Sequence, residues 1–295
     1  MKVVITGSQS FIGKVLETTL TAQGHEVFGV DSVALGGANS LAADIRDPAL
    51  ADRLPEMDAM IHLAAISREP DCAADPRLAF DVNVTGTANL LMAARKRNAR
   101  QVIFASSEWV YGDVANDAVQ SEDTVIDPAA VRNEYAATKL AGEMALNVAV
   151  RRGLEGGTVL RFGIVYGPRK ANWSAVEALV NTARTSETVT VGSLATARRF
   201  IHVRDIASGI GAALGRRGFE IFNLAGDRLV TLGDVIEAAR SRLGKQLQVT
   251  ERDASAISIR NPVNDRVKRE LRWAPQTSLE TGVAELLEYF REGEK

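Results

Sequence analysis

The sequence predicts an α/β fold: a doubly wound parallel sheet with a smaller, interleaved C-terminal domain. The first 165 residues alternate short apolar runs with amphipathic helical stretches, which is the pattern of repeated βαβ units around a parallel sheet. A chain of 295 residues is also long for one compact core and sufficient for two. We expect the first domain to take residues 1–166 and 198–225, and the second 167–197 and 226–295. No flexible linker is evident, so the two should close directly over a shared cleft.

Five apolar runs are predicted as strands, each ending in a loop at the sheet edge where folds of this class bind ligands. They are Lys2–Thr6, Glu26–Val30, Ala59–Leu63, Gln101–Ser106 and Gly157–Phe162. Amphipathic periodicity predicts helices at Ser10–Gln23, Ala79–Lys96, Tyr135–Arg152, Trp173–Thr185, Asp234–Arg242 and Leu279–Arg291. In addition, Arg199–Leu214 starts as a strand and becomes helical, and Gln246–Thr250 is predicted as a strand.

Composition excludes several classes of function. The hydrophobic share of 46% and the charged share of 24% are those of an ordinary soluble globular protein. A formal net charge of -2 gives no electrostatic reason to expect nucleic acid or an anionic membrane as partner. The single cysteine, Cys72, excludes an internal disulfide, and the three histidines show no ligand spacing, so no metal site is expected.

The distribution of apolar residues predicts cytoplasmic residence. The residues from Met1 onward enter a strand pattern at once, with no room for a signal sequence. No later segment approaches an uncharged apolar run long enough to span a bilayer.

The stretch Thr6–Gly13 predicts a pyrophosphate site, because it links the first strand to the first helix, where backbone N–H groups and the helix dipole attract anions. Gly7 suits the tight turn, and Gly13 lets helix and strand approach closely. Ser10 replaces the middle glycine of the usual pattern; its Cβ would crowd a phosphate, but its hydroxyl can donate to one. Phe11 and Ile12 complete the predicted contact. The alternative is a plain strand-to-helix turn.

Asp31 ends the second predicted strand, where a carboxylate accepts hydrogen bonds from a ribose diol and repels a 2'-phosphate. No Arg or Lys follows it closely, so NAD is favoured over NADP. Asp44 and Ile45 are weaker candidates for contact with the adenine edge, and the alternative is that Asp44 only caps a turn.

Tyr135 and Lys139 are four residues apart in a predicted helix, so both side chains share one face. A nearby ammonium favours phenolate over phenol and should lower the tyrosine pKa from about 10 toward neutrality. Ser107, at the end of a strand, can orient a substrate oxygen, which makes the three residues a proton-transfer triad for hydride chemistry. A solvated surface pair is the alternative for Tyr135 and Lys139 alone.

Together these residues resemble the extended short-chain dehydrogenase/reductase superfamily, within it the NAD-dependent sugar epimerase/dehydratase family, and there the UDP-glucose 4-epimerase type. The resemblance runs through nearly the whole chain. Its motifs, in order, are the glycine turn, His62–Ala65, Asn83–Thr87, Ser106–Ser107 with Val110–Gly112, Tyr135 to Lys139, Leu160–Arg161 with Val165–Arg169, Arg198 to Asp205, and Leu271–Pro275. It implies a Rossmann NAD-binding domain and a substrate-binding C-terminal domain.

The resemblance also implies the residues that contact each ligand. Those expected along NAD, besides the turn residues, Asp31, Asp44, Ile45 and the Tyr135–Lys139 pair, are Leu63, Ala64, Ala65, Asn83, Ala105 and Phe162. Those expected at the substrate are Ser67, Ser107, Glu108, Trp109, Arg198 and Arg260. Arg198 would pair with a substrate phosphate, with a surface ion pair as the alternative, and Arg260 would be a second phosphate contact. Trp109 would supply either a stacking surface or packing.

The residues before Tyr111 argue against dehydration. Trp109 occupies the position where dehydratases and decarboxylases of this family carry an acid, and only Glu108, one place earlier, matches a dehydratase carboxylate. Ile164 replaces the asparagine that usually holds the substrate pyrophosphate, and the loop at 170–191 is short, so the substrate is expected to differ from a usual uridine-linked hexose.

The expected function is therefore an NAD-dependent epimerase that acts on a sugar or nucleotide sugar, at C4, through a transient keto intermediate. The first alternative is an NAD-dependent sugar or uronate dehydrogenase or reductase, because both reactions use the same triad. The second is a non-catalytic NAD-binding regulator. By resemblance, the helices Ala79–Lys96 and Tyr135–Arg152 are expected to pair across the two-fold axis of a homodimer.

Overall fold

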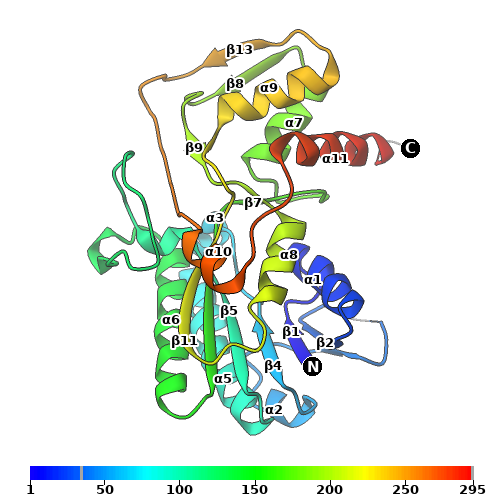
Figure 1. The fold of residues 1–295 in the computed structure, drawn as a ribbon, viewed down its shortest axis with the longest axis vertical. Coiled ribbons are helices and arrows are strands. Elements are labelled where there is room, and N and C mark those ends of the chain that lie inside the picture. The colour runs from blue at the N-terminus through cyan, green and yellow to red at the C-terminus, as the bar shows by residue number, and fades with distance from the viewer. Residues whose placement is uncertain (34–35, 294–295) are drawn as a thin grey trace.

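The computed structural model describes residues 1–33 and 36–293, and its centre is a seven-stranded parallel sheet in the order β11-β6-β5-β4-β1-β2-β3 (Figure 1). The strands are β1 (Lys2–Thr6), β2 (Glu26–Asp31), β3 (Ser40–Ala42), β4 (Ala59–His62), β5 (Gln101–Ser107), β6 (Gly156–Phe162) and β11 (Gly218–Leu224). Every neighbouring pair is parallel, which confirms the doubly wound sheet.

Helices cover both faces of this sheet, because alternate strand residues point to opposite sides. Val3 and Ile5 pack into a core beneath α1 (Phe11–Ala22) and α8 (Val203–Ala212). Val4, between them, packs into the opposite core. That second core is closed by α2 (Leu50–Arg53), α5 (Gly86–Lys96) and α6 (Glu134–Arg151).

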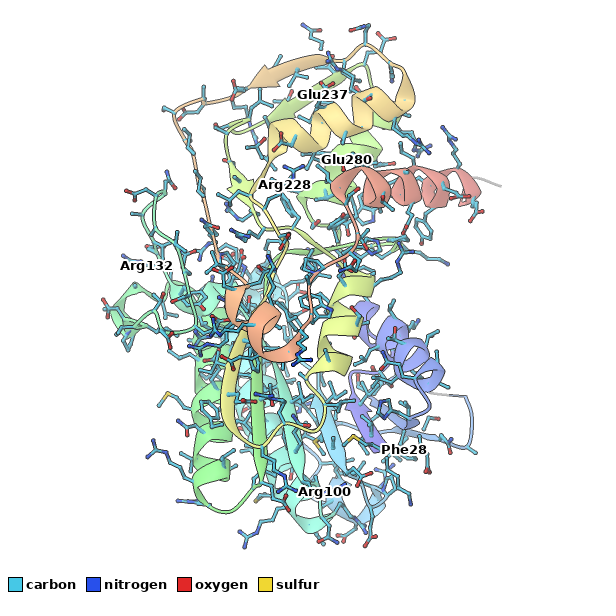
Figure 2. The ribbon with its side chains drawn as sticks, in the orientation of Figure 1. Phe28, Arg100, Arg132, Arg228, Glu237 and Glu280 are labelled. Atoms are coloured by element: carbon cyan, nitrogen blue, oxygen red, sulfur yellow. The ribbon has the colours of Figure 1, made fainter. Side chains whose placement is uncertain are left out.

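A second layer of helices and short strands lies above the carboxyl ends of the sheet strands (Figure 1). It contains α7 (Ala175–Thr185), α9 (Leu232–Leu243) and α11 (Leu279–Glu292), with the parallel pair β8 (Thr188–Val191) and β13 (Gln248–Glu251). These elements share their own hydrophobic core. Figure 2 shows Arg228 and Glu280 on this layer, with charged groups 3.9 Å apart, and Arg100, which precedes β5, at the opposite end of the molecule.

Short strands connect the two layers. Strand β7 (Val165–Tyr166) pairs with β10 (Ile201–His202), and β9 (Ala197–Arg198) pairs with β12 (Val230–Thr231). An extended segment then runs from β13 down to α10 (Asp265–Leu271) (Figure 1). Val267 and Trp273, which the sequence assigns to the second domain, pack into the core of the sheet. The division at residues 167, 198 and 226 stays a prediction.

The predicted elements agree with the structure to within about two residues, with one exception. The helix predicted at Ala79–Lys96 is divided into α4 (Pro76–Phe80), a π-helical turn (Asp81–Thr85) and α5. In this turn the Gly86 N–H donates to the carbonyl of Asp81, five residues earlier. A single π turn rotates the residues that follow relative to a regular helix, and such turns are common at functional sites.

Several short or partly exposed elements carry no clear sequence signal. They are β3, β7, β8, β9, β12, α2, α3 (Glu69–Ala74), α10 and β11. Strand β11 begins with exposed and half-buried residues because it lies at the edge of the sheet, so its pattern lacks a continuous apolar run. Among the described residues, no helix combines the length and the apolar character needed to cross a membrane.

Candidate active site

The glycine turn between β1 and α1 is built so tightly that two positions exclude a side chain. Gly7 has a φ of 74°, and a Cβ there would lie 2.8 Å from the backbone nitrogen of Ala64. A Cβ on Gly13 would lie 2.3 Å from the carbonyl oxygen of Gly7. The turn is held by the Gly7 N–H, which donates to Val30 at 2.8 Å. The loop after β4 and the start of α1 therefore both approach Gly7 closely.

The side chains around this turn fit the pyrophosphate and ribose of a dinucleotide. Ser10 caps α1, accepting the Gly13 N–H at 3.0 Å, so its hydroxyl hydrogen remains available to an anion. One oxygen of Asp31 accepts the Gln9 N–H at 2.8 Å, which places this carboxylate beside the turn. Phe11 lies under Arg169, whose guanidinium carbon is 4.5 Å from the ring centroid.

The two adenine candidates are engaged elsewhere. Asp44 accepts the backbone N–H of Arg46 at 2.8 Å and pairs with its guanidinium at 2.6 Å, and this hydrogen bond lowers the pKa of the Asp44 carboxyl. It therefore caps a turn, which is the alternative noted above. The side chain of Ile45 is buried against Gly86. Contact of either residue with adenine stays a prediction.

A buried histidine organises the centre of the cofactor side. His62 Nδ1 lies 2.9 Å from the Thr6 hydroxyl, and Nε2 lies 2.9 Å from the Thr87 hydroxyl. The Thr87 hydroxyl donates its own hydrogen to the Asn83 carbonyl at 2.6 Å, so Nε2 must carry the imidazole hydrogen and Nδ1 must accept from Thr6. Burial lowers the pKa of His62 to about 3, which keeps the ring neutral.

Asn83, on the π turn, joins the cofactor loop to the catalytic helix. Its Oδ1 accepts the Ile66 N–H at 2.8 Å, and its Nδ2 donates to the Ile66 carbonyl at 2.9 Å. Nδ2 also donates to the hydroxyl of Thr138 at 3.0 Å, and this hydroxyl donates to the carbonyl of Tyr135 at 2.8 Å. Asn83 thus fixes the loop that contains Leu63, Ala64 and Ala65. The bridging role of Thr138 carried no signal in the sequence.

The predicted triad converges at the carboxyl end of β5. Helix α6 is capped by Asn133, whose side chain accepts the Ala136 N–H at 2.8 Å, and its first turns carry Tyr135 and Lys139. Lys139 Nζ lies 5.7 Å from the centroid of the Tyr135 ring and 5.0 Å from that of Phe104. The Ser107 side chain hydrogen-bonds to the phenol of Tyr135. Ala105 on β5 and Phe162 on β6 are buried in the core beside α1.

Desolvation dominates the titration of this triad. Burial raises the pKa of Tyr135 to about 12, although the hydrogen bond with Ser107 acts in the opposite direction. Burial also lowers the pKa of Lys139 to about 8. The expectation that Lys139 holds the pKa of Tyr135 below its usual value is therefore wrong for this structure, because the loss of water around the phenol raises this pKa and outweighs the opposing hydrogen bond with Ser107.

A buried ion pair supports the triad from one helical turn further along α6. Both carboxylate oxygens of Glu143 are bound by Arg161, at 3.0 and 2.7 Å, and one also accepts the Ser106 hydroxyl at 2.5 Å. Arg161 stacks over the ring of Tyr111 at 4.9 Å. Since Ser106 precedes Ser107 and Glu143 follows Lys139, the pair clamps β5, β6 and α6 together. A buried Arg in a β strand was the signal available in the sequence.

Of the predicted substrate residues, all but Ser67 are buried or half-buried. Glu108 is buried, and Arg260 is nearly so, with its guanidinium carbon 4.1 Å from the Trp109 ring centroid. Arg198, half-buried, donates to the backbone carbonyl of Ser258 at 2.6 Å and to its hydroxyl at 3.0 Å. Ser67, in contrast, is exposed on the loop after β4.

The cations at the substrate end are held by neighbouring chain segments. Burial lowers the pKa of Arg198 and of Arg260, and the charge of Glu108 raises both. Within residues 1–33 and 36–293, Arg198 forms no ion pair closer than 4.0 Å, so its contacts differ from the surface ion pair that the sequence left open. Two guanidinium groups that act on the same carboxyl, Glu108, suit an anionic ligand.

Comparison with known families decides the wider assignment. A family model described as "NAD dependent epimerase/dehydratase family" matches residues 3–225. The chain belongs to this family. It is thus an enzyme of the extended short-chain dehydrogenase/reductase type with NAD as cofactor, which confirms the resemblance seen in the sequence.

Relatives of known reaction and structure cover the whole chain. A UDP-glucose 4-epimerase from Mycolicibacterium smegmatis is 30% identical over 313 residues, with 99% of each chain covered. MoeE5 in complex with UDP-glucose and NAD is 27% identical, with a TM-score of 0.87 over 100% of both chains. The same protein in complex with UDP-glucuronic acid and NAD gives 27% and 0.86, covering 99% of this chain and 100% of that one. UDP-glucose 4-epimerase from Thermotoga maritima with UDP-glucose is 25% identical, with a TM-score of 0.88 over 100% of both.

Proposed function

We propose that this protein is an NAD-dependent nucleotide-sugar epimerase that inverts C4 of the sugar. The observation that carries the proposal is the convergence of Tyr135, Lys139 and Ser107 beside the glycine turn and the loop held by Asn83. Two relatives that match over nearly their whole length are UDP-glucose 4-epimerases, which supports the proposal. An epimerase needs one hydride carrier and one group that moves a proton, and this arrangement supplies the second next to the expected position of the first.

Each residue of the triad has a separate role in the proposed reaction. Tyr135 removes the proton from the C4 hydroxyl and later returns it, and Ser107 holds the same oxygen by a hydrogen bond. Lys139, next to the phenol on α6, stabilises the phenolate while it is charged. NAD held at the glycine turn and Asp31 would supply the hydride acceptor and donor, and the positive charge of an oxidised nicotinamide would favour the phenolate.

We assign the cofactor and the substrate to two separate groups of residues. Asp31, beside the glycine turn, is the acceptor for the adenosine ribose diol. Arg198 and Arg260 at the other end bind the diphosphate of the substrate. Ile164 packs beside the core of the second layer in place of the usual asparagine, so these two arginines carry most of the diphosphate contact.

Cofactor retention and product analysis test this function. The purified protein should contain tightly bound NAD and, in a screen of nucleotide sugars that begins with UDP-glucose and UDP-galactose, should interconvert one pair of C4 epimers with no net change in absorbance of the reduced cofactor. Steady NADH formation with a sugar or uronate would instead identify the dehydrogenase alternative. Bound NAD without turnover of any nucleotide sugar would leave the non-catalytic alternative and remove this proposal.

The same helices that carry the site offer a surface for a homodimer. Met92 on α5 and Met144 and Val148 on α6 are exposed, with exposed fractions of 66%, 64% and 45%. Phe80 on α4 lies in the groove beside Met144. Exposed apolar side chains grouped on two adjacent helices are typical of an interface. A solution mass of twice 31.7 kDa supports the dimer, and the single-chain mass would exclude it. Cytoplasmic residence stays a prediction.

A further inference from the structure

Glu108 is a buried carboxyl without a hydrogen-bond donor. Its side chain is 1% exposed, and neither oxygen has a hydrogen-bond partner among the described residues. Burying such a group without a partner is costly, and nearly all buried polar groups in native proteins have one. A ligand bound beside Glu108 would supply the missing hydrogen-bond donor.

The position of Glu108 relates it to both ends of the expected substrate. It directly follows Ser107, which contacts Tyr135. Arg198 and Arg260 are the charged groups that act on it electrostatically, and Asp113 acts on Arg260 only. In the proposed function, the C4 hydroxyl lies at Tyr135 and the diphosphate at the two arginines. The sugar ring joins these two points, and we place it beside Glu108.

We infer that Glu108 is a specificity-determining residue: its carboxyl accepts a hydrogen bond from a sugar hydroxyl and discriminates against a sugar that carries a carboxylate on that side. This inference rests on the proposed function and deepens it, because it selects neutral nucleotide hexoses over nucleotide uronates. MoeE5, the relative described with both UDP-glucose and UDP-glucuronic acid, shows that the two classes share this fold.

The ionisation of Glu108 makes this selection depend on pH. Burial raises the pKa of the carboxyl to about 7, and the two arginines act in the opposite direction. A diphosphate at the arginines offsets their charge equally for a hexose and for a uronate. What differs is the second carboxylate, which an ionised Glu108 repels and a protonated Glu108 can hydrogen-bond. Discrimination against uronates must therefore increase as pH rises.

Binding to an inactive holoenzyme measures the selection without turnover. The Tyr135→Phe protein, saturated with NAD, would be titrated with UDP-glucose and with UDP-glucuronate by calorimetry at about pH 6 and about pH 9. UDP-glucose should bind more tightly than UDP-glucuronate. The dissociation constant of UDP-glucuronate divided by that of UDP-glucose should increase at least about tenfold between these pH values, since each pH unit above a pKa changes such a ratio by up to about tenfold. Adding Glu108→Gln, which keeps the size and removes the charge, should make the ratio independent of pH.

Glu122→Gln in the same background is the matched control. Glu122 is also a buried carboxyl with a pKa raised by burial, but it binds the backbone N–H of Asn223 and lies near Arg266 instead. Its variant should keep the full pH dependence. The inference is overturned if Glu108→Gln leaves the ratio unchanged, or if the ratio for the Tyr135→Phe protein with Glu108 intact does not change with pH. Either result leaves the epimerase proposal intact. Failure of both nucleotide sugars to bind at either pH overturns this inference, whereas the proposed function is decided separately by cofactor retention and by turnover of other nucleotide sugars.

Discussion

Lys139 Nζ lies 5.7 Å from the centroid of the Tyr135 ring and closer, at 5.0 Å, to the ring of Phe104. The ammonium is therefore held over an aromatic face in the core of the site, where the ring quadrupole favours its charge. Desolvation lowers the pKa of Lys139 to about 8, although the charges of Cys72 and Glu143 act in the opposite direction. The pKa values of Tyr135 and Lys139 are thus determined more by burial than by contact between the two side chains.

Replacing Tyr135 by Phe should reduce kcat by about a hundredfold to ten-thousandfold, because the C4 hydroxyl loses its proton acceptor. Affinity for NAD should change little, since the ring is kept. Conversion of UDP-galactose measured by coupled assay, and NAD content measured after denaturation, separate the two effects. The control is Tyr289→Phe, which removes a phenol at the second-layer core. Unchanged turnover in Tyr135→Phe would refute the assigned proton transfer.

Gly13→Ala should abolish tight NAD binding. Its Cβ would lie 2.3 Å from the Gly7 carbonyl oxygen, so the start of α1 must move away from the turn that holds the pyrophosphate. NAD retention through gel filtration gives the readout. Gly192→Ala is the matched control, because nothing lies within 4 Å of the added Cβ and its backbone does not need glycine. Equal NAD retention in the two variants would show that the close approach is not required.

Asn83→Ala should lower the free energy of unfolding by about 3 kcal/mol, because it leaves the N–H and carbonyl of Ile66 without their partner. It should also weaken NAD binding, since the loop after β4 loses its anchor. Asn223→Ala removes a comparable set of buried hydrogen bonds at β11. Chemical denaturation should show similar losses in both, whereas NAD titration should separate them. A normal NAD affinity in Asn83→Ala would contradict the anchoring role.

Glu108→Gln should change how stability depends on pH. The folded protein holds the Glu108 proton up to a pKa of about 7, whereas the unfolded chain releases it near 4.5. The folded state therefore binds more protons between these values, and its free energy of unfolding falls as pH rises through them. At about 1.4 kcal/mol per pH unit, the loss is about 3 kcal/mol.

Urea denaturation from about pH 4.5 to about pH 8 measures this contribution. The free energy of unfolding of the unsubstituted protein should fall relative to that of Glu108→Gln as pH rises over that range. A difference between the two proteins that stays constant with pH would mean that Glu108 titrates in the folded protein as it does in the unfolded chain.

Local patterns were sufficient for the scaffold. The turn at Gly7 and Gly13, the strand Lys2–Thr6 and the helix with Tyr135 and Lys139 depend on neighbouring residues, and the structure places all of them as predicted. The π turn at Asp81–Thr85 was not predictable, because its sequence continues a regular helical pattern. Its register is decided by contacts of Asn83 with Ile66 and Thr138, the latter 55 residues away.

By itself, the sequence determined the parallel sheet, the residues of the triad and the family, because periodicity and short motifs encode relations between residues close in the chain. Only the tertiary structure decided the tautomer of His62, the direction of the Tyr135 pKa and the burial of Glu108 without a hydrogen-bond partner among the described residues. The physical reason is desolvation. Whether a polar group keeps its water depends on segments that pack over it from distant parts of the chain, and no local pattern records which segments those are.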